Sequence, residues 1–329
     1  MKKLILPLLL LSNIAISNSA QAQSQSMFAV VGGFEYLFER VFHIESSPNP
    51  GYRIDYSRKS TLRDIAQYNI NSELRNPNIN STFSFTNTDK DFEGVFKKDM
   101  GVCRGYSGLR RKFRFLSFFD YNNVSKIEVP SRENEKKFVK FYKKIVKDIR
   151  NYKFRVIPGF SNLKDFSSDP LLAPMLKWQV LYEWKDRNFS PGMGTGKLLK
   201  GAFVHSTYEE MMDVRDRIEK NKQLGHNTLM WLSQKKSSWI HALEAIDATT
   251  VQEDGSFKIT FWNDKFINLD RAQSSLLVLA DGRLIYNDTI VERELNAAGV
   301  TDENDGEIVY MSQKLKEFCS SSPEKCELK

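Results

Sequence analysis

The chain has 329 residues, with 48 lysines and arginines against 41 acidic residues. This length is enough for one large domain or two lobes with a substantial core. The positive charge is mostly lysine spread over expected helices. It therefore predicts no nucleic-acid partner and is compatible with contact to anionic cell-envelope surfaces.

The first 22 residues have the pattern of a signal peptide. Met1-Lys2-Lys3 is followed by a largely apolar run from Leu4 to Ile16, and Ala20-Gln21-Ala22 has the form of a signal-peptidase site. The apolar run is too short to span a bilayer, and we expect no transmembrane segment. We therefore expect an exported protein, either periplasmic or secreted into the medium. Residues 23–94 are then predicted to form an N-terminal covering or pro-like segment.

The cysteines separate into a pair and one remaining residue. Cys319 and Cys326 lie close together near the C-terminus, where an oxidising compartment would allow a disulfide bond. Cys103 is left over, and an odd cysteine in an exported protein indicates either a partner chain or a reactive thiol.

Cys103 lies within Gly101-Val102-Cys103-Arg104-Gly105-Tyr106-Ser107-Gly108, where a loop is expected to give way to a helix. Apolar residues then recur at Tyr106, Leu109, Phe113 and Leu116, a helical spacing. At a helix start the backbone N–H groups and the helix dipole favour a thiolate. The alternative is a small buried cysteine that only serves packing.

Residues 95–189 are expected to form a helical lobe. A second helix is predicted from a Ser131 cap to about Tyr152. A third is predicted from about Pro174 to Lys185, with Met175, Trp178, Leu181 and Tyr182 facing inward. The second helix carries an apolar stripe and a lysine-rich remainder: Phe138, Phe141, Tyr142, Ile145 and Ile149, then Lys136, Lys137, Lys140, Lys143, Lys144 and Lys147. The glycine-rich residues 190–206 fail the P-loop pattern and are predicted to be a linker.

Residues 207–290 are expected to form an antiparallel β lobe, and residues 291–329 a C-terminal tail. Thr207-Tyr208-Glu209-Glu210 has the form of a capping box for a helix to about Asn221. Strands are then predicted over 227–232, 239–246, 257–262, 276–280 and 283–286, with turns at Asp254-Gly255 and Asp281-Gly282. A helix is expected from about Gln313.

His241 lies near the start of one predicted strand, and Asn263 and Asp264 end the next. An imidazole needs an oxygen partner to fix its tautomer and ring plane. A tight hairpin about Asp254-Gly255 pairs Asn263 with Ile246, five residues from His241. A bulge, a longer loop or a turn in the chain after Trp262 is needed to bring it to His241. The alternative for His241 is a structural role.

The order Cys103, His241, Asn263 resembles that of the papain-like cysteine peptidases, over about residues 95–287. The separation of Cys103 and His241 falls within that family's usual range of roughly 130–150 residues. The resemblance implies an α+β papain-like fold, with a helical lobe that carries the cysteine and an antiparallel β lobe that carries histidine and asparagine. It implies a thiol protease in which Cys103 is the nucleophile, His241 the base and Asn263 the orienting residue, with Asp264 as the alternate.

The resemblance is partial. Of the family's cysteine signature only Gly101 and Cys103 coincide, and Phe96, Lys97 and Lys98 supply no oxyanion-hole glutamine. The Gly-x-Cys-x-Gly-Tyr form is also similar to transglutaminase-like cores. Three alternatives stay open: a cysteine peptidase acting on protein or peptide, a transglutaminase-like or peptidoglycan amidase activity, and a non-catalytic envelope or binding protein. No metal or other cofactor is expected, because the remaining histidines lack a ligand spacing.

Overall fold

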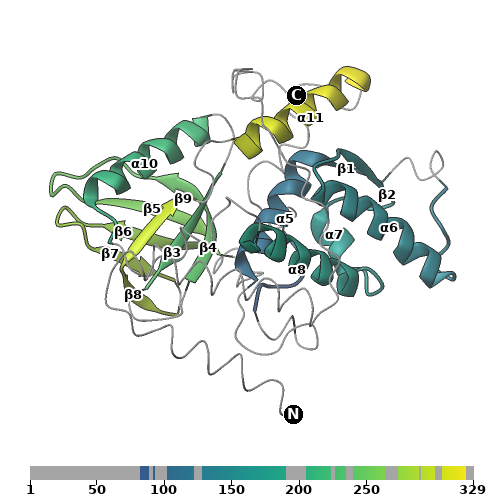
Figure 1. Ribbon diagram of the computed structural model, residues 1–329, viewed down its shortest axis with the longest axis horizontal. Helices are drawn as coiled ribbons and strands as arrows, with labels where there is room; N and C mark the ends of the chain where they lie inside the picture. Colours follow the sequence, from purple (N-terminus) through teal and green to yellow (C-terminus); the bar gives the residue numbers. More distant parts are fainter. Residues whose placement is uncertain are drawn as a thin grey trace, which may run out of the picture. The chain divides into compact units, whose positions relative to one another are not determined.

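A computed structural model describes residues 82–88, 92, 102–121, 128–189, 205–223, 227–234, 240–263, 273–288, 290–300 and 306–323. Internal contacts separate Met1–Arg53 from Ile54–Lys329, and all described residues belong to the second unit. This unit is α+β, with a group of helices followed in sequence by a curled antiparallel sheet (Figure 1). The predicted signal peptide and Asp264 lie outside the described residues, as do most of 23–94 and of the linker 190–206.

Helix α5 (Cys103–Leu116) is surrounded by other elements, and all its residues are buried. Its predicted apolar stripe is confirmed, because Tyr106, Leu109, Phe113 and Leu116 all belong to the core of the helical part. Residues 82–88 also reach this core: the Tyr106 hydroxyl donates to the backbone carbonyl of Phe85 at 2.7 Å. Part of the predicted covering segment is thus packed against α5.

The other helices among the described residues of this part are α6 (Glu135–Arg150), α7 (Leu163–Ser168) and α8 (Ala173–Phe189). A parallel pair of strands, β1 (Ser117–Asp120) and β2 (Arg155–Pro158), lies beside them and was not predicted. In chain order β1 follows α5 directly, and β2 follows α6 after a short connection.

Two predictions about these helices are wrong in detail. The cap of α6 is Asn134, whose side chain accepts from the Lys137 N–H, whereas Ser131 accepts from Glu133 in the preceding turn. Trp178 is 43% exposed. The other three residues expected to face inward do so at least in part, since Met175 and Leu181 are buried and Tyr182 is half-buried. Leu176, Val180 and the charged Glu183 are also buried on this helix and were not predicted.

Gly105 and Gly108 allow α5 and α8 to approach closely. A Cβ atom on Gly105 would lie 2.3 Å from the Val180 carbonyl oxygen and 2.5 Å from the Trp184 Cβ. A Cβ atom on Gly108 would lie 2.1 Å from Nε of Arg187. These distances are shorter than van der Waals contact, so the two glycines of the cysteine segment serve helix packing.

The second part of the chain begins with α10 (Tyr208–Gln223), which packs on the sheet. Its capping box is confirmed: the Thr207 N–H donates to the Glu210 carboxylate at 3.0 Å, and the Glu210 N–H donates to the Thr207 hydroxyl at 3.2 Å. Met211 and Ile218 on its inner face join the core of the sheet.

The sheet has seven strands in the order β8-β7-β6-β5-β4-β3-β9. The predicted strands correspond to β3 (Thr228–Ser233), β4 (Ile240–Ala248), β5 (Phe257–Trp262), β6 (Gln273–Val278) and β7 (Leu284–Asn287). The sheet continues beyond residue 290 with β8 (Glu292–Leu295) and β9 (Ala297–Val300). These two strands lie at opposite edges but only Asn296 separates them in the chain, so the sheet must curl until its edges meet.

Both predicted Asp-Gly turns are confirmed. Gly255 has φ +79° and Gly282 has φ +84°, a left-handed conformation that glycine adopts without steric cost. The chain then ends in α11 (Gly306–Ser321), which begins earlier than predicted and contacts α5. None of the helices in the described part of the chain has the length and apolar composition needed to cross a bilayer.

Replacing Gly105 by alanine should destabilise the protein by about 1–3 kcal/mol, because the new methyl group forces α5 and α8 apart. At an ordinary helix position the same change stabilises by up to about 1 kcal/mol, so the sign of the effect is diagnostic. Urea unfolding would measure it, with Lys143→Ala on exposed α6 as a control expected within about 0.5 kcal/mol of wild type. An unchanged or higher stability of Gly105→Ala would contradict the close packing.

Candidate functional site

The Cys103 side chain lies where the start of α5 meets strand β4. Its sulfur accepts a hydrogen bond from the backbone N–H of Ala242 at 3.3 Å, so the thiol lies beside the peptide bond that follows His241. The β4–β5 ladder ends at the pair Glu244–Trp262. Ala242 therefore lies beyond the end of the β5 ladder, and its N–H donates to sulfur instead. Cys103 and Ala242, 139 positions apart in the sequence, are thereby brought together.

Two features beside Cys103 favour a negative charge on sulfur, whereas the burial of the residue opposes it. Cys103 is the first residue of α5, and its N-cap Val102 provides no side-chain hydrogen bond to the first turn. The positive end of the helix dipole thus faces the thiol. Arg104 adds a cation: burial and Arg187 lower its pKa to about 10, while a charged Cys103 acts to raise it. By the same interaction, Arg104 stabilises the Cys103 thiolate.

The strand register brings Asn263 closer to His241 than a tight hairpin would. The connection from β4 to β5 is a loop from Thr249 to Ser256, and the register shifts between Ala245 and Asp247. Continuing the ladder past the Glu244–Trp262 pair places Asn263 beside Leu243. A longer loop and a bulge thus narrow the predicted gap between Asn263 and His241 from five residues to two.

On this continuation of the ladder, His241 and Asn263 are diagonal neighbours on the face of the sheet opposite to that of Ala242 and Glu244. Diagonal neighbours are roughly 7–8 Å apart, a separation that aromatic and long side chains can bridge. Both residues are buried. The Asn263 side-chain nitrogen donates to the Tyr286 hydroxyl at 3.3 Å. Asp264, the predicted alternate, lies outside the described residues.

Glu244 connects β4 to the second half of α5. Its carboxylate lies 3.2 Å from Arg110 and 2.8 Å from Arg114, and it accepts from the Asn227 amide at 3.2 Å. Burial raises the pKa of Glu244, but the two arginines outweigh burial and lower it to about 2. Glu244 lies two residues from Ala242, on the same face of β4. The ion pairs therefore hold the Ala242 N–H against Cys103.

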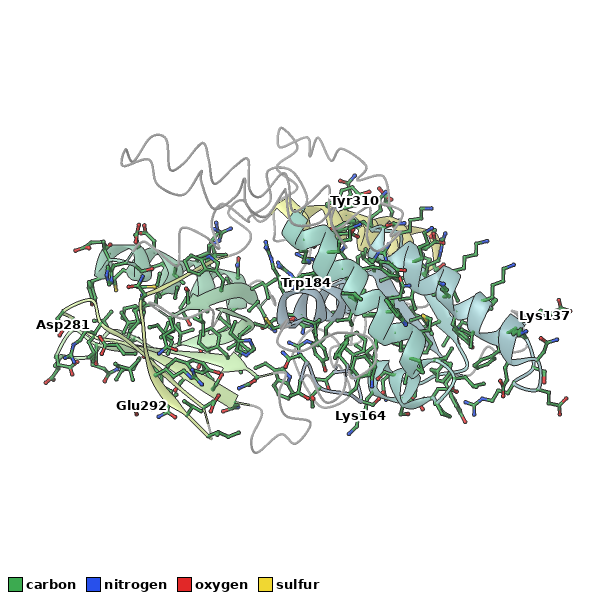
Figure 2. The ribbon with its side chains drawn as sticks, turned by 60° about the horizontal axis from the view of Figure 1, so that its bottom comes forward. Lys137, Lys164, Trp184, Asp281, Glu292 and Tyr310 are labelled. Carbon is green, nitrogen blue, oxygen red and sulfur yellow. The ribbon has the colours of Figure 1, made fainter. Side chains whose placement is uncertain are left out.

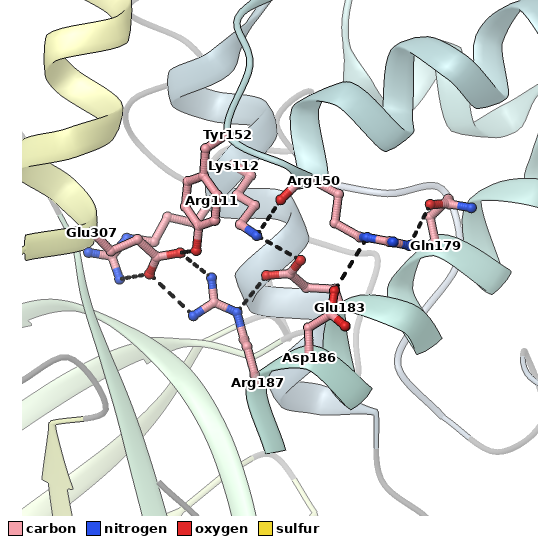
Figure 3. A network of polar contacts seen from close by, with 9 residues as sticks. All are labelled: Arg111, Lys112, Arg150, Tyr152, Gln179, Glu183, Asp186, Arg187 and Glu307. Atoms are coloured by element: carbon pink, nitrogen blue, oxygen red, sulfur yellow. Dashed lines mark hydrogen bonds and ion pairs between the residues drawn. The ribbon is translucent and has the colours of Figure 1, made fainter. Parts of the chain in front are cut away.

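A second group of buried charges lies on the side of α5 that faces α8 and α11 (Figure 3). Lys112 donates to Glu183 at 2.8 Å and lies 3.8 Å from the centroid of the Tyr152 ring. Arg187 donates to Glu183 at 2.7 Å and to Glu307 at 3.2 Å. The Tyr152 hydroxyl also donates to Glu307 at 2.7 Å. Glu307 on α11 is thereby connected to both α5 and α8.

These charged residues were not predicted as part of the site. A glutamate inside an otherwise apolar strand, Ile240-His241-Ala242-Leu243-Glu244, was a signal that could have indicated Glu244. The role of Glu244 can be recognised only together with the arginines of α5, and the sequence does not reveal that these arginines are buried. Cys319 is buried on α11, and its predicted disulfide partner Cys326 lies outside the described residues, so this disulfide stays a prediction.

A groove of about 760 Å³ lies elsewhere, between the start of α10 and the β6–β7 turn. Its lining includes His205, Tyr208 and Arg283 but none of Cys103, His241 and Asn263. Arg283 is paired with Asp281 at 2.8 Å within the turn. Among the described residues no group of three or more His, Cys, Asp or Glu side chains has an arrangement that could hold a metal ion.

Comparison with known proteins identified no matching protein-family model, curated protein or solved structure. The chemistry of the site must therefore be inferred from its own geometry.

Glu244→Gln should destabilise the protein by about 3–5 kcal/mol at pH 7, because it leaves Arg110 and Arg114 buried without their carboxylate. It should also change the pH dependence. The folded-state pKa of Glu244 is about 2, below an unfolded value near 4.3, so its contribution is full above the unfolded value and lost as pH falls toward 2.

Urea unfolding of wild type and Glu244→Gln at pH 7, 4.5 and 3 would test this, with Glu253→Gln in the exposed β4–β5 loop as the matched control. The difference in stability between wild type and Glu244→Gln should shrink between pH 4.5 and 3. A constant difference over this range would show that Glu244 is not held ionised in the folded state.

Proposed function

We propose that the protein is a thiol hydrolase that cleaves amide or ester bonds by acyl transfer, in the manner of the papain-like cysteine peptidases. The observation that carries this proposal is the 3.3 Å contact between the Cys103 sulfur and the N–H of Ala242. It brings a thiol at a helix start next to the only strand of the described residues that carries a histidine.

In this proposal Cys103 transfers its proton to the His241 imidazole, and the thiolate attacks the substrate carbonyl carbon. The protonated His241 then donates its proton to the leaving amine or alcohol as the tetrahedral intermediate collapses to a thioester. Water deprotonated by His241 adds to the thioester, and the thiolate leaves as the acid product is released. Atoms and charges balance without a redox partner.

The neighbouring groups support each role. The helix dipole, the Ala242 N–H and Arg104 favour the thiolate, so less basicity is required of His241. Asn263 offers its amide oxygen to an imidazole N–H, because its nitrogen is used by Tyr286. The backbone N–H of Cys103 is proposed as one oxyanion donor. A single donor is worth roughly 100- to 1000-fold in rate.

Thiol reactivity tests this proposal without knowledge of the substrate. Alkylation of Cys103 by iodoacetamide, followed by mass spectrometry of its peptide, should be fast at pH 6 in wild type. In His241→Ala the rate should rise only near pH 8.5, the ordinary thiol pKa, whereas the control His205→Ala should behave like wild type. Labelling that rises near pH 8.5 in all three proteins would instead favour the non-catalytic alternative.

Asn263→Ala should lower the alkylation rate at pH 6 by at least about 10-fold, because the imidazolium loses the oxygen that orients it. Asn287→Ala, at the exposed end of β7, is the matched control and should leave the rate unchanged. Near-ultraviolet circular dichroism would verify that both variants are folded. Equal rates in Asn263→Ala and wild type would remove Asn263 from the proposed site.

A further inference from the structure

Helix α6 presents a row of lysines to solvent. Between positions 136 and 147 the sequence contains six lysines and no acidic residue. All six are exposed, and none of them forms an ion pair within the described part of the chain: Lys136, Lys137, Lys140, Lys143, Lys144 and Lys147. Figure 2 shows Lys137 on the outer side of the helix. At 1.5 Å per residue the row is about 18 Å long.

The repulsion between these lysines destabilises the helix. Lys136 and Lys140, Lys140 and Lys144, and Lys143 and Lys147 are each four residues apart, and like charges at this spacing destabilise a helix by about 0.2–0.5 kcal/mol per pair. Two nearby arginines do have carboxylate partners, since Arg132 pairs with Asp169 and Arg155 pairs with Asp148. The six lysines of the row therefore differ from these arginines, because no carboxylate among the described residues forms an ion pair with them.

Helix α10 shows what an ordinary solvated helix of this protein looks like. Acidic and basic residues are mixed along its exposed side, and Lys222 pairs with both Glu219 and Asp247. Arg215 likewise pairs with Asp216. Because α6 and α10 both have 16 residues, the single-sign surface of α6 is not a consequence of helix length or of solvent exposure alone.

We propose that the lysine row of α6 binds the surface of an anionic phospholipid membrane. Lysines near such a surface each contribute by attraction to the negative headgroups, and a straight row on a helix can contact a planar surface along its whole length. The apolar side of α6 is already used: Phe138, Tyr142, Val146 and Ile149 are buried in the core. Binding is thus electrostatic, without insertion of apolar side chains into the bilayer.

Chemistry favours lipid headgroups over nucleic acid as the partner. The row contains no arginine for bidentate contacts to phosphates or base edges. The aromatic residues of the helix, Phe138, Phe141 and Tyr142, are buried or half-buried, so no exposed aromatic platform is available for stacking bases. The export expected from residues 1–22 also places the protein where anionic lipids are accessible.

Sedimentation of the purified protein with vesicles of 30% phosphatidylglycerol in phosphatidylcholine, at 50 mM NaCl, would test the proposal. We expect binding that falls steeply at 300 mM NaCl and is absent with pure phosphatidylcholine. Lys140→Gln, Lys143→Gln and Lys147→Gln combined should weaken binding on the order of 100-fold, at roughly 5-fold per lysine.

The matched control is Lys220→Gln, Lys258→Gln and Lys316→Gln combined, which removes the same charge from exposed positions on three other elements. It should bind the vesicles like wild type. Equal weakening by both triple variants would overturn the proposal, because binding would then follow net charge alone. Binding to duplex DNA with no binding to anionic vesicles would also overturn it. Far-ultraviolet circular dichroism would verify that the variants are folded. If the triple α6 variant is unfolded, the single variant Lys140→Glu takes its place.

Discussion

The buried positive charge of α5 is the constraint on which the arrangement of the other elements depends. A cation removed from water costs several kcal/mol unless carboxylates neutralise it, and α5 buries five cations. The carboxylates that the structure pairs with this helix come from three different elements, α8, β4 and α11. Forming all of these ion pairs at once is possible for only a few placements of α8, β4 and α11 around α5. The residues concerned are Arg104, Arg110, Arg111, Lys112 and Arg114, with Glu183, Glu244 and Glu307.

The same ion pairs determine the geometry of the thiol. Cys103, Arg110 and Arg114 are seven and four residues apart, so they lie along one side of α5, and Ala242 and Glu244 lie along one face of β4. Charge pairing at Glu244 therefore aligns the two elements so that the Ala242 N–H meets the Cys103 sulfur. On the opposite side, Gly105 sets the approach of α8. The position of the sulfur thus depends on packing and charge around the whole helix.

Much of the secondary structure could be predicted from the sequence, because its signals are local. The stripe of α5, the capping box at Thr207 and the turns at Gly255 and Gly282 depend on residues a few positions apart. Short strands such as β8, the exposure of Trp178 and the burial of Glu183 depend on partners far along the chain, so they could not be predicted. The approach of Asn263 to His241 was uncertain for the same reason, since a bulge near Ile246 has no sequence signature of its own. The burial of the α5 arginines could not be predicted either, because the sequence does not show that Glu244 faces them.

The central claim is that Cys103 and His241 share a proton, and the titration of the His241 imidazole tests it most directly. Nuclear magnetic resonance of labelled histidines would follow this titration in wild type and in Cys103→Ala, with the signal assigned by its loss in His241→Ala. If the thiolate stabilises the imidazolium, the pKa of His241 lies above its ordinary value of about 6.5 in wild type and falls to or below it in Cys103→Ala. The same pKa in both proteins would contradict the account and leave Cys103 as a packing residue at the start of α5.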